Sequence, residues 1–297
     1  MTKPIVFLLS NRALKKHIDI SYKESYIYLA AMAQKHGIDV RFVLGVEHYK
    51  DGLFTSYWKF HGDELVQIHE AFKAHVVYVR DRIKHIAFEK KVNDSLIEEI
   101  CRDKLKTYQT YPTLVKKTVL VSPVDISSFG QLQTELVALK PRYGSNGRSV
   151  QVLPKGDITP EILRSDEFVA QELIDSSGGI EGILSQRHEL RVYVFNGEIR
   201  AGYIRVPAPH SYIANISRGA KEKQIQLSDI PQSAIDLAGQ VDSKFTHTPR
   251  LYTIDIMYEH GKPWVVELND NPGMPDITIQ PFTDDYLTTL LDFLQTS

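Results

Sequence analysis

Two carboxylates and one amide occupy a pair of strand-like segments near the end of the 297-residue sequence. Asp255 lies in YTIDIMY and Glu267 and Asn269 lie in VVELNDNPG, with the turn signal EHGK between them, so the two segments are expected to pair. Glu267 and Asn269 share one face of their strand, and pairing can bring Asp255 to that face. Three oxygen donors on one face suit Mg²⁺, which combines a few carboxylates with substrate oxygens. The alternative is that this face of the sheet is simply exposed to solvent. In both cases the side chains expected to point the opposite way, into the core, are those of Ile254, Ile256, Val266 and Leu268.

A glycine-containing loop lies further upstream. Residues 144–149 read GSNGRS between two strand-like runs, and Lys140 stands just before them. Small residues allow backbone N–H groups to close over phosphates, and a lysine adds a point charge. The Gly-Lys-Ser/Thr ending and following helix of a Walker motif are missing. A plain hairpin turn is the alternative for this loop.

Three arginines lie in or beside a further set of strand-like runs: Arg191 in HELRVYVF, Arg205 in YIRVP and Arg218 in ANISRGA. Single arginines are usually surface or salt-bridge residues, but three beside a carboxylate set favour binding of an oxyanion or phosphate. The strand EFVAQELID (167–175) ends in backbone groups that could read an adenine edge, with simple packing as the alternative.

The elements that must position these residues follow from periodicity and turn signals. Apolar runs at 4–9 and 38–45 flank a helix over 23–36 that Gly37 closes, which predicts a strand–helix–strand start with parallel pairing. A hairpin over 54–68 and an inner strand over 75–82 follow. This part of the chain is therefore expected to be a small α/β domain.

The remaining two-thirds of the chain has a different pattern. A helix over 93–108 is expected to begin at Asn93 as its cap. Three hairpins follow, which indicates a mainly antiparallel α+β region. Helices are predicted near 231–245 and over 284–295.

The composition excludes several classes of protein. With 42% hydrophobic and 24% charged residues, the chain is neither disordered, collagen-like nor a coiled coil. Its 35 Lys+Arg nearly balance 37 Asp+Glu, so nucleic acid is not expected as a partner. The first apolar run is too short for a secretory signal, and a membrane helix needs about twenty apolar residues, so a cytoplasmic protein without a membrane partner is expected. Cys101, the single cysteine, is expected as a buried small hydrophobe rather than a nucleophile.

The order of these features along the chain resembles the ATP-grasp superfamily, particularly RimK-like glutamate ligases, glutathione synthetases and peptide ligases. The closing ELNDNPG is similar to the family's E-x-N-x-x-P-G signature. The resemblance implies an ATP-grasp fold, with α/β and α+β parts, over residues 93–297, after an N-terminal Rossmann-like pre-ATP-grasp domain at 1–92. It divides the later part into a lysine and flap subdomain at 93–173 and a metal-binding subdomain at 174–297.

The resemblance also implies roles for individual residues. The nucleotide phosphates are assigned to Lys104 and Lys140 and to a flap of Gly144, Ser145, Asn146 and Gly147. The adenine hinge is assigned to Gln171, Glu172, Leu173 and Ile174, and the ribose to Glu181 with Asp175 as the alternative. Mg²⁺, as two ions and with Mn²⁺ as an alternative, is assigned to Asp255, Glu267 and Asn269. The transferred phosphate is assigned to Arg191, with Asn215 and Arg218 nearby. The sequence departs from the family pattern at Glu189, where many relatives have Asp, and in a longer segment over 175–187.

The activity implied is that of an ATP-dependent carboxylate–amine ligase, which forms an amide or peptide bond through an acyl phosphate and releases ADP and phosphate. The substrate is expected to be an amino acid or peptide, and Arg205, His210 and Tyr212 lie where a second substrate could bind. The alternatives are an ATP-grasp kinase that phosphorylates a small-molecule hydroxyl and a non-catalytic ATP-binding module. Assembly into a homo-oligomer is left open.

Overall fold

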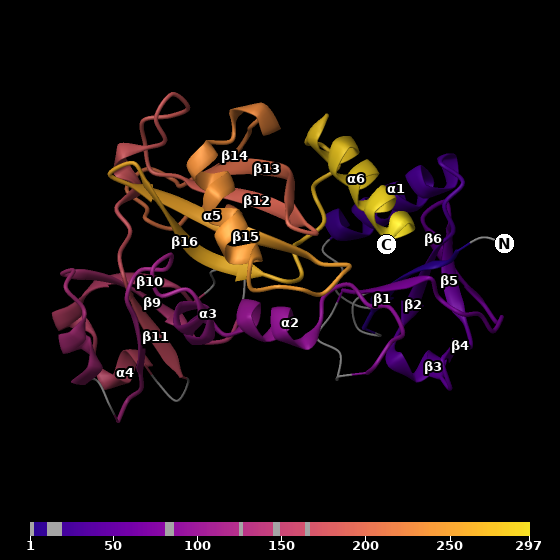
Figure 1. Ribbon diagram of the computed structural model, residues 1–297, viewed down its shortest axis with the longest axis horizontal. Helices are drawn as coiled ribbons and strands as arrows, with labels where there is room; N and C mark the ends of the chain where they lie inside the picture. Colours follow the sequence, from indigo (N-terminus) through magenta and orange to yellow (C-terminus); the bar gives the residue numbers. More distant parts are fainter. Residues whose placement is uncertain (1–2, 11–19, 81–85, 125–126, 145–148, 164–166) are drawn as a thin grey trace. The chain divides into compact units, whose positions relative to one another are not determined.

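The computed structural model describes residues 3–10, 20–80, 86–124, 127–144, 149–163 and 167–297. The chain divides into two compact units (Figure 1). The first contains Met1–Asp94, His247–Leu251 and Asn271–Ser297, and the second contains Ser95–Thr246 and Tyr252–Asp270. The first unit therefore takes residues from both ends of the chain. The domain ranges 1–92 and 93–297, with their subdivision at 173/174, stay a prediction.

A five-stranded mixed sheet in the order β6-β5-β2-β1-β7 forms the centre of the first unit. Its strands are β1 (Ile5–Leu9), β2 (Val40–Leu44), β5 (Tyr57–His61), β6 (Glu64–Ile68) and β7 (Val76–Val79). Strand β1 is parallel to both β2 and β7, whereas β5 is antiparallel to β2 and β6. The parallel start and the hairpin both agree with the prediction from the sequence.

Within the described residues of this unit the chain forms two α-helices, α1 (Ile20–Lys35) and α6 (Phe282–Thr296). Gly37 ends α1 in the left-handed conformation at φ 69°, as predicted for a C-terminal cap. The hydroxyl of Tyr28 on α1 donates to Asp284 on α6 at 2.7 Å, so the last helix of the chain packs with the first. A short 3₁₀ helix, η1 (Val46–His48), and a two-stranded ribbon of β3 (Tyr49–Lys50) and β4 (Leu53–Phe54) complete the unit.

The predicted helix over 93–108 is wrong in two respects. The chain forms two helices, α2 (Ser95–Arg102) and α3 (Lys104–Thr110), because the Asp103 carboxylate accepts the backbone N–H groups of Leu105 and Lys106 and caps a new helix. Because α2 begins at Ser95, Asn93 lies one residue before the position of its cap. Its side chain instead exchanges two hydrogen bonds with the backbone of Leu251, at 2.7 and 2.8 Å.

Two antiparallel sheets build the second unit. The smaller has the order β10-β9-β11-β8, with β8 (Thr118–Val121), β9 (Leu136–Pro141), β10 (Gln151–Pro154) and β11 (Phe168–Glu172). The larger has the order β14-β13-β12-β15-β16, with β12 (Glu189–Phe195), β13 (Glu198–Val206), β14 (Lys221–Gln224), β15 (Leu251–Glu259) and β16 (Lys262–Asn269). The three predicted hairpins correspond to β9–β10, β12–β13 and β15–β16.

Helices and short 3₁₀ turns connect these strands: η2 (Ser127–Gln131), η3 (Lys155–Asp157), α4 (Pro160–Leu163), η4 (Ser176–Gly178), η5 (Ile216–Arg218), η6 (Leu227–Asp229) and α5 (Gln232–Asp242). Helix α5 lies over the larger sheet (Figure 1), and its Leu237 and Val241 are buried in one cluster with Leu190 and Ile254 of the sheet. Burial of this apolar face is what holds the helix to the strands. None of the described helices has both the length and the apolar character that a membrane span requires.

A β-bulge corrects the prediction for Val266. The register pairs Asp255 with Glu267 but Ile256 with Val265, so the β15–β16 ladder shifts by one residue between them. An extra residue in one strand reverses the faces of the residues beyond it. Val265 is therefore completely buried in the core, whereas Val266 is half-buried and lines a cavity with Lys140 and Glu267.

Candidate functional site

A buried cluster of two carboxylates and two arginines lies on the larger sheet of the second unit. Arg191 of β12 donates to both oxygens of Asp255 on β15, from Nε to Oδ1 at 2.6 Å and from NH2 to Oδ2 at 2.7 Å. Arg205 of β13 donates to Oδ2 of the same carboxylate at 2.7 Å and also pairs with Glu189 of β12, which stands directly opposite it in the register. Three neighbouring strands thus contribute to one ion cluster.

The electrostatics of this cluster separate its two acids. Burial by itself would raise the pKa of Asp255, but Arg191 and Arg205 outweigh that effect and hold the pKa at about 2. Burial raises the pKa of Glu189 to about 7, because the attraction of Arg205 does not fully compensate for lost hydration. Asp255 is therefore the carboxylate that stays ionised in this cluster at neutral pH.

A second group of charges surrounds Glu267 on the neighbouring strand β16. Lys104, at the start of α3, places its Nζ 3.5 Å from Oε1 of Glu267 and 2.8 Å from the carbonyl oxygen of Gly144. Lys140 of β9 donates from Nζ to Oε1 of Gln171 at 2.7 Å. The structure thus brings together two lysines and a carboxylate that lie far apart in the sequence.

Lys140 is a buried cation whose charge is only partly compensated. Burial lowers its pKa to about 8, and Lys104 acts in the same direction against the attraction of Glu267. The amide of Gln171 is fixed on its other side by a 3.0 Å hydrogen bond to Thr118. A small cavity opens among these groups; its lining residues are Lys104, Thr107, Val115, Thr118, Lys140, Val169, Gln171, Val266 and Glu267.

The expected metal ligands fit a divalent cation in donor type. Asp255 and Glu267 are register partners, and Asn269 lies two residues beyond Glu267 on the same strand. Although Asp255 accepts three bonds, its Oδ1 accepts only one of them and keeps a lone pair for a further partner. Among the described residues no group of three His, Cys, Asp or Glu side chains could hold a metal. A metal site here would therefore consist of two carboxylates and the amide oxygen of Asn269.

The structure describes the expected flap and hinge only in part. Gly144 is described, but Ser145, Asn146 and Gly147 lie outside the described residues. In the hinge, Glu172 accepts the backbone N–H of Gln133 at 2.8 Å, Leu173 is half-buried and Ile174 is buried.

The two carboxylates expected at the ribose have different surroundings. Asp175 pairs with Arg187 at 3.3 Å and accepts the backbone N–H of Ser177 at 3.1 Å. Glu181 is exposed. Neither observation assigns a ribose contact, so this role stays a prediction.

The next residues to consider are those expected near the transferred phosphate and those expected at a second substrate, which lie in different local environments. Asn215 precedes η5, and its carbonyl oxygen accepts the backbone N–H of Arg218 at 2.9 Å. His210 is exposed at φ 65°, and the Tyr212 ring lies 4.3 Å beneath the guanidinium carbon of Arg187. Arg205, expected with these two at a second substrate, lies in the buried Asp255 cluster, and its role toward a substrate stays a prediction.

One ion pair near the site was missed from the sequence. Arg142 donates from Nε and NH2 to the two oxygens of Asp103, at 2.9 and 2.8 Å. This bidentate pair ties the start of α3, which carries Lys104, to the end of β9, which leads to Gly144. The signal available in the sequence was Asp103 itself, whose place before a polar helical stretch is typical of an N-cap.

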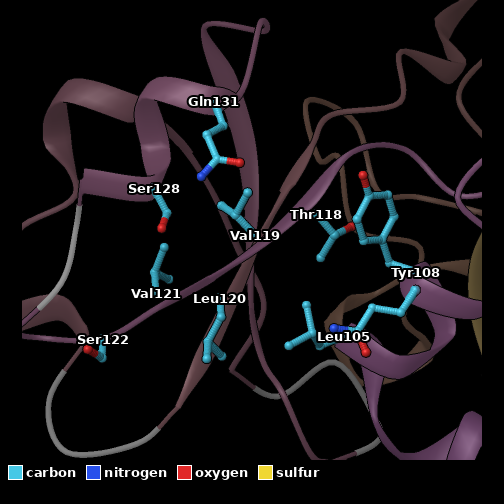
Figure 2. Close-up of a pocket in the computed structure, with 10 residues that line it drawn as sticks. Leu105, Tyr108, Thr118, Val119, Leu120, Val121, Ser122, Ser128 and Gln131 are labelled. Atoms are coloured by element: carbon cyan, nitrogen blue, oxygen red, sulfur yellow. The ribbon is translucent and has the colours of Figure 1, made fainter.

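Thr118 also borders a larger hollow (Figure 2). It measures about 390 Å³ and is bordered by Leu105 and Tyr108 of α3, by Val119–Val121 of β8 and by Ser128 and Gln131 of η2. Its lining contains no charged side chain. Lys104 and Lys140, the lysines expected at the nucleotide phosphates, line the smaller cavity instead.

Two antiparallel sheets that present lysines, arginines and carboxylates in this way define an ATP-grasp protein. The family model of the RimK-like ATP-grasp domain matches residues 102–284, and the chain belongs to this family. A curated relative, a probable alpha-L-glutamate ligase of Alcanivorax borkumensis, is 23% identical over 199 residues, which are 63% of this chain. The chain matches only 61% of that relative's length.

Solved structures share the fold across nearly the whole chain. The ATP complex of D-alanine–D-alanine ligase from Bacillus anthracis has a TM-score of 0.65 at 14% identity, covering 99% of this chain and 96% of that chain. The ATP-grasp ligase PsnB with a minimal precursor has a TM-score of 0.60 at 15% identity, covering 100% and 99%. A RimK-domain ATP-grasp protein of Sphaerobacter thermophilus has a TM-score of 0.58 at 12% identity, covering 98% and 99%. The ATP-grasp fold expected from the sequence is therefore confirmed.

Proposed function

We propose that this protein is an ATP-dependent carboxylate–amine ligase that joins an amino acid or peptide to an amine. The observation that carries the proposal is the charge arrangement of the second unit, in which Lys104 and Lys140 adjoin Glu267 while Arg191 and Arg205 hold Asp255. Transfer of a phosphoryl group depends mainly on positioning and on neutralising negative charge, and this arrangement supplies both. The relatives described above that are named as ligases support the same class of reaction.

The proposed reaction has two steps. A substrate carboxylate oxygen attacks the γ-phosphorus of ATP, and the bond to the β–γ bridging oxygen breaks, giving an acyl phosphate and ADP. The amine nitrogen then attacks the acyl carbon, the bond to the phosphate oxygen breaks, and an amide, inorganic phosphate and a proton are produced. The two substrates provide the two nucleophiles, a carboxylate oxygen and an amine nitrogen, so no side-chain nucleophile is needed.

Different residues of the site have different proposed roles in this reaction. We propose that Lys104 and Lys140 hold the ATP phosphates and that Arg191 stabilises the charge on the transferred group. Mg²⁺ held by Asp255, Glu267 and Asn269 would supply further positive charge at the phosphates. Thr118 and Gln171 keep Lys140 directed into the cavity through their chain of hydrogen bonds.

Interception of the acyl phosphate tests this proposal. Amino acids and short peptides are screened with ATP and Mg²⁺, with and without hydroxylamine, and ADP and products are followed by mass spectrometry. A ligase is expected to release ADP only with a suitable carboxylate and to give a hydroxamate when hydroxylamine is present. A stable phosphorylated alcohol with no amide would identify a kinase instead, and binding of ATP without any ADP release would identify a non-catalytic module.

The pH dependence of ATP binding tests the role of Lys140. Because its pKa is about 8, Lys140 loses its proton as the pH rises through that value, and its attraction for phosphate is lost with it. We expect Mg²⁺–ATP affinity to fall above pH 8 and binding near pH 8 to take up protons, measured by calorimetry in buffers of different ionisation enthalpy. Lys140→Arg, which stays charged, is expected to give a nearly flat profile over the same range. Identical profiles for the two proteins would exclude Lys140 as a phosphate ligand.

A further inference from the structure

Thr253 of β15 has a buried hydroxyl that no group in the described part of the chain satisfies. The residue is 1% exposed, and its Oγ1 has no hydrogen-bond partner among the described residues. Each of the other buried threonines that the structure describes donates from Oγ1 to a backbone carbonyl oxygen: Thr107, Thr118 and Thr283. Because a buried hydroxyl without a partner costs stability, Thr253 is a candidate for a bond that forms only when a ligand binds.

The alternation of β15 places Thr253 on the face that carries the Asp255 carboxylate. Tyr252 and Ile254 are completely buried in the apolar core of the second unit. Successive side chains of a strand point to opposite faces, so Thr253 and Asp255 project from the other face of the sheet. Thr253 therefore lies on the same side of β15 as an expected metal ligand.

Thr253 also stands directly opposite Asn269, the expected amide ligand of the cation, in the register of β15 and β16. The next pair on the same face is Asp255 with Glu267, and the β-bulge begins only after that pair. Residues directly opposite each other on antiparallel strands have Cβ atoms about 4.5–5.5 Å apart. A side-chain rotation is therefore sufficient to bring the hydroxyl of Thr253 and the amide of Asn269 into hydrogen-bond contact.

An asparagine that gives its carbonyl oxygen to a cation still has an amide nitrogen with two N–H donors to satisfy. A hydroxyl oxygen accepts from such a donor, and partners of this kind fix the orientation of a metal ligand. We propose that Thr253 is a positioning residue: its hydroxyl accepts a hydrogen bond from the amide nitrogen of Asn269 and thereby holds the amide oxygen toward Mg²⁺. This inference rests on the proposed function and adds to its cation site a residue that tightens binding of the ion.

Two measurements on the full-length protein test the proposal. The first is the melting temperature of the EDTA-treated protein. The second is the Mg²⁺ concentration that gives half of the full gain in affinity for a non-hydrolysable ATP analogue, taken from calorimetric titrations at a series of Mg²⁺ concentrations. The variants are Thr253→Val, which replaces the hydroxyl by a methyl group, and Thr253→Ser, which keeps the hydroxyl. Thr134→Val is the matched control, because its lost hydroxyl donates to the carbonyl oxygen of Leu136 at 2.8 Å.

Thr253→Val is expected to keep or raise the melting temperature, by up to about 4 °C, because it removes an unpaired buried hydroxyl. The same variant is expected to need about ten- to a hundredfold more Mg²⁺. Thr253→Ser is expected to need the same Mg²⁺ concentration as wild type within a few-fold. Thr134→Val is expected to melt at a lower temperature with an unchanged Mg²⁺ requirement. A purely structural role for Thr253 would not give a stable protein with a weakened cation site.

A lower melting temperature for Thr253→Val would assign its hydroxyl a structural bond and overturn the proposal. An unchanged Mg²⁺ requirement in Thr253→Val, a loss of equal size in Thr253→Ser or Thr134→Val, or a wild-type affinity that does not depend on Mg²⁺ would overturn it as well. If the Mg²⁺ requirement depends on the hydroxyl but no carboxylate gives ADP, the ligase function is rejected and the role of Thr253 stands. A hydroxamate from wild type together with an unchanged Mg²⁺ requirement in Thr253→Val rejects the role of Thr253 alone.

Discussion

Asp255→Asn is expected to lower the free energy of unfolding by about 3–5 kcal/mol, because it removes one partner from a buried ion cluster. The asparagine has nearly the same volume, so no cavity forms. Its amide cannot balance the two guanidinium groups of Arg191 and Arg205, which together donate three hydrogen bonds to the native carboxylate. Arg205 keeps Glu189 as a partner, whereas Arg191 loses both of its hydrogen bonds to the carboxylate at position 255.

Denaturant unfolding at neutral pH measures this loss as a lower midpoint with an unchanged slope. Asp229→Asn, at an exposed position in η6, is the matched control and is expected to change stability by less than about 0.5 kcal/mol. A loss of under about 1 kcal/mol for Asp255→Asn would contradict the ion cluster as described.

The sign of the pH dependence provides a second check on the same variant. The folded-state pKa of Asp255, about 2, lies below the ordinary value of 3.8, so its contribution to stability is complete above about pH 4. That contribution is lost as the pH falls through 2. Wild type and Asp255→Asn are therefore expected to converge in stability at acid pH.

Arg191→Ala is expected to lower turnover by about 10²- to 10³-fold while leaving affinity for ATP within a few-fold of wild type. Its two bonds to Asp255 fix the guanidinium beside an expected metal ligand, whereas the ATP phosphates are assigned to Lys104 and Lys140. A group that acts only on the phosphoryl group in transfer affects kcat far more than ground-state binding. Asp255 keeps Arg205 as a partner in this variant, so the fold is expected to survive.

Steady-state ADP release and titration with a non-hydrolysable ATP analogue separate the two effects. Arg191→Lys is the informative companion, because it keeps the charge but not the two-pronged contact, and it is expected to lie between alanine and wild type. Equal losses in kcat and in affinity for the ATP analogue would assign Arg191 to ground-state ATP binding and contradict its proposed role.

The sequence alone determined the local features and the family of this protein. EHGK and the alternation on either side of it were enough to predict the β15–β16 hairpin, since a tight turn and a period of two are local properties. The same is true of α1 and its glycine cap. The ELNDNPG motif and the order of the preceding residues were enough to identify the ATP-grasp family that the family model confirms.

Only the tertiary structure decided which charges meet. Nothing local predicts that Asp255 binds Arg191 and Arg205, because that contact depends on β15 lying beside β12 in the sheet. A one-residue bulge, which alternation cannot reveal, moved Val266 from the core to the cavity.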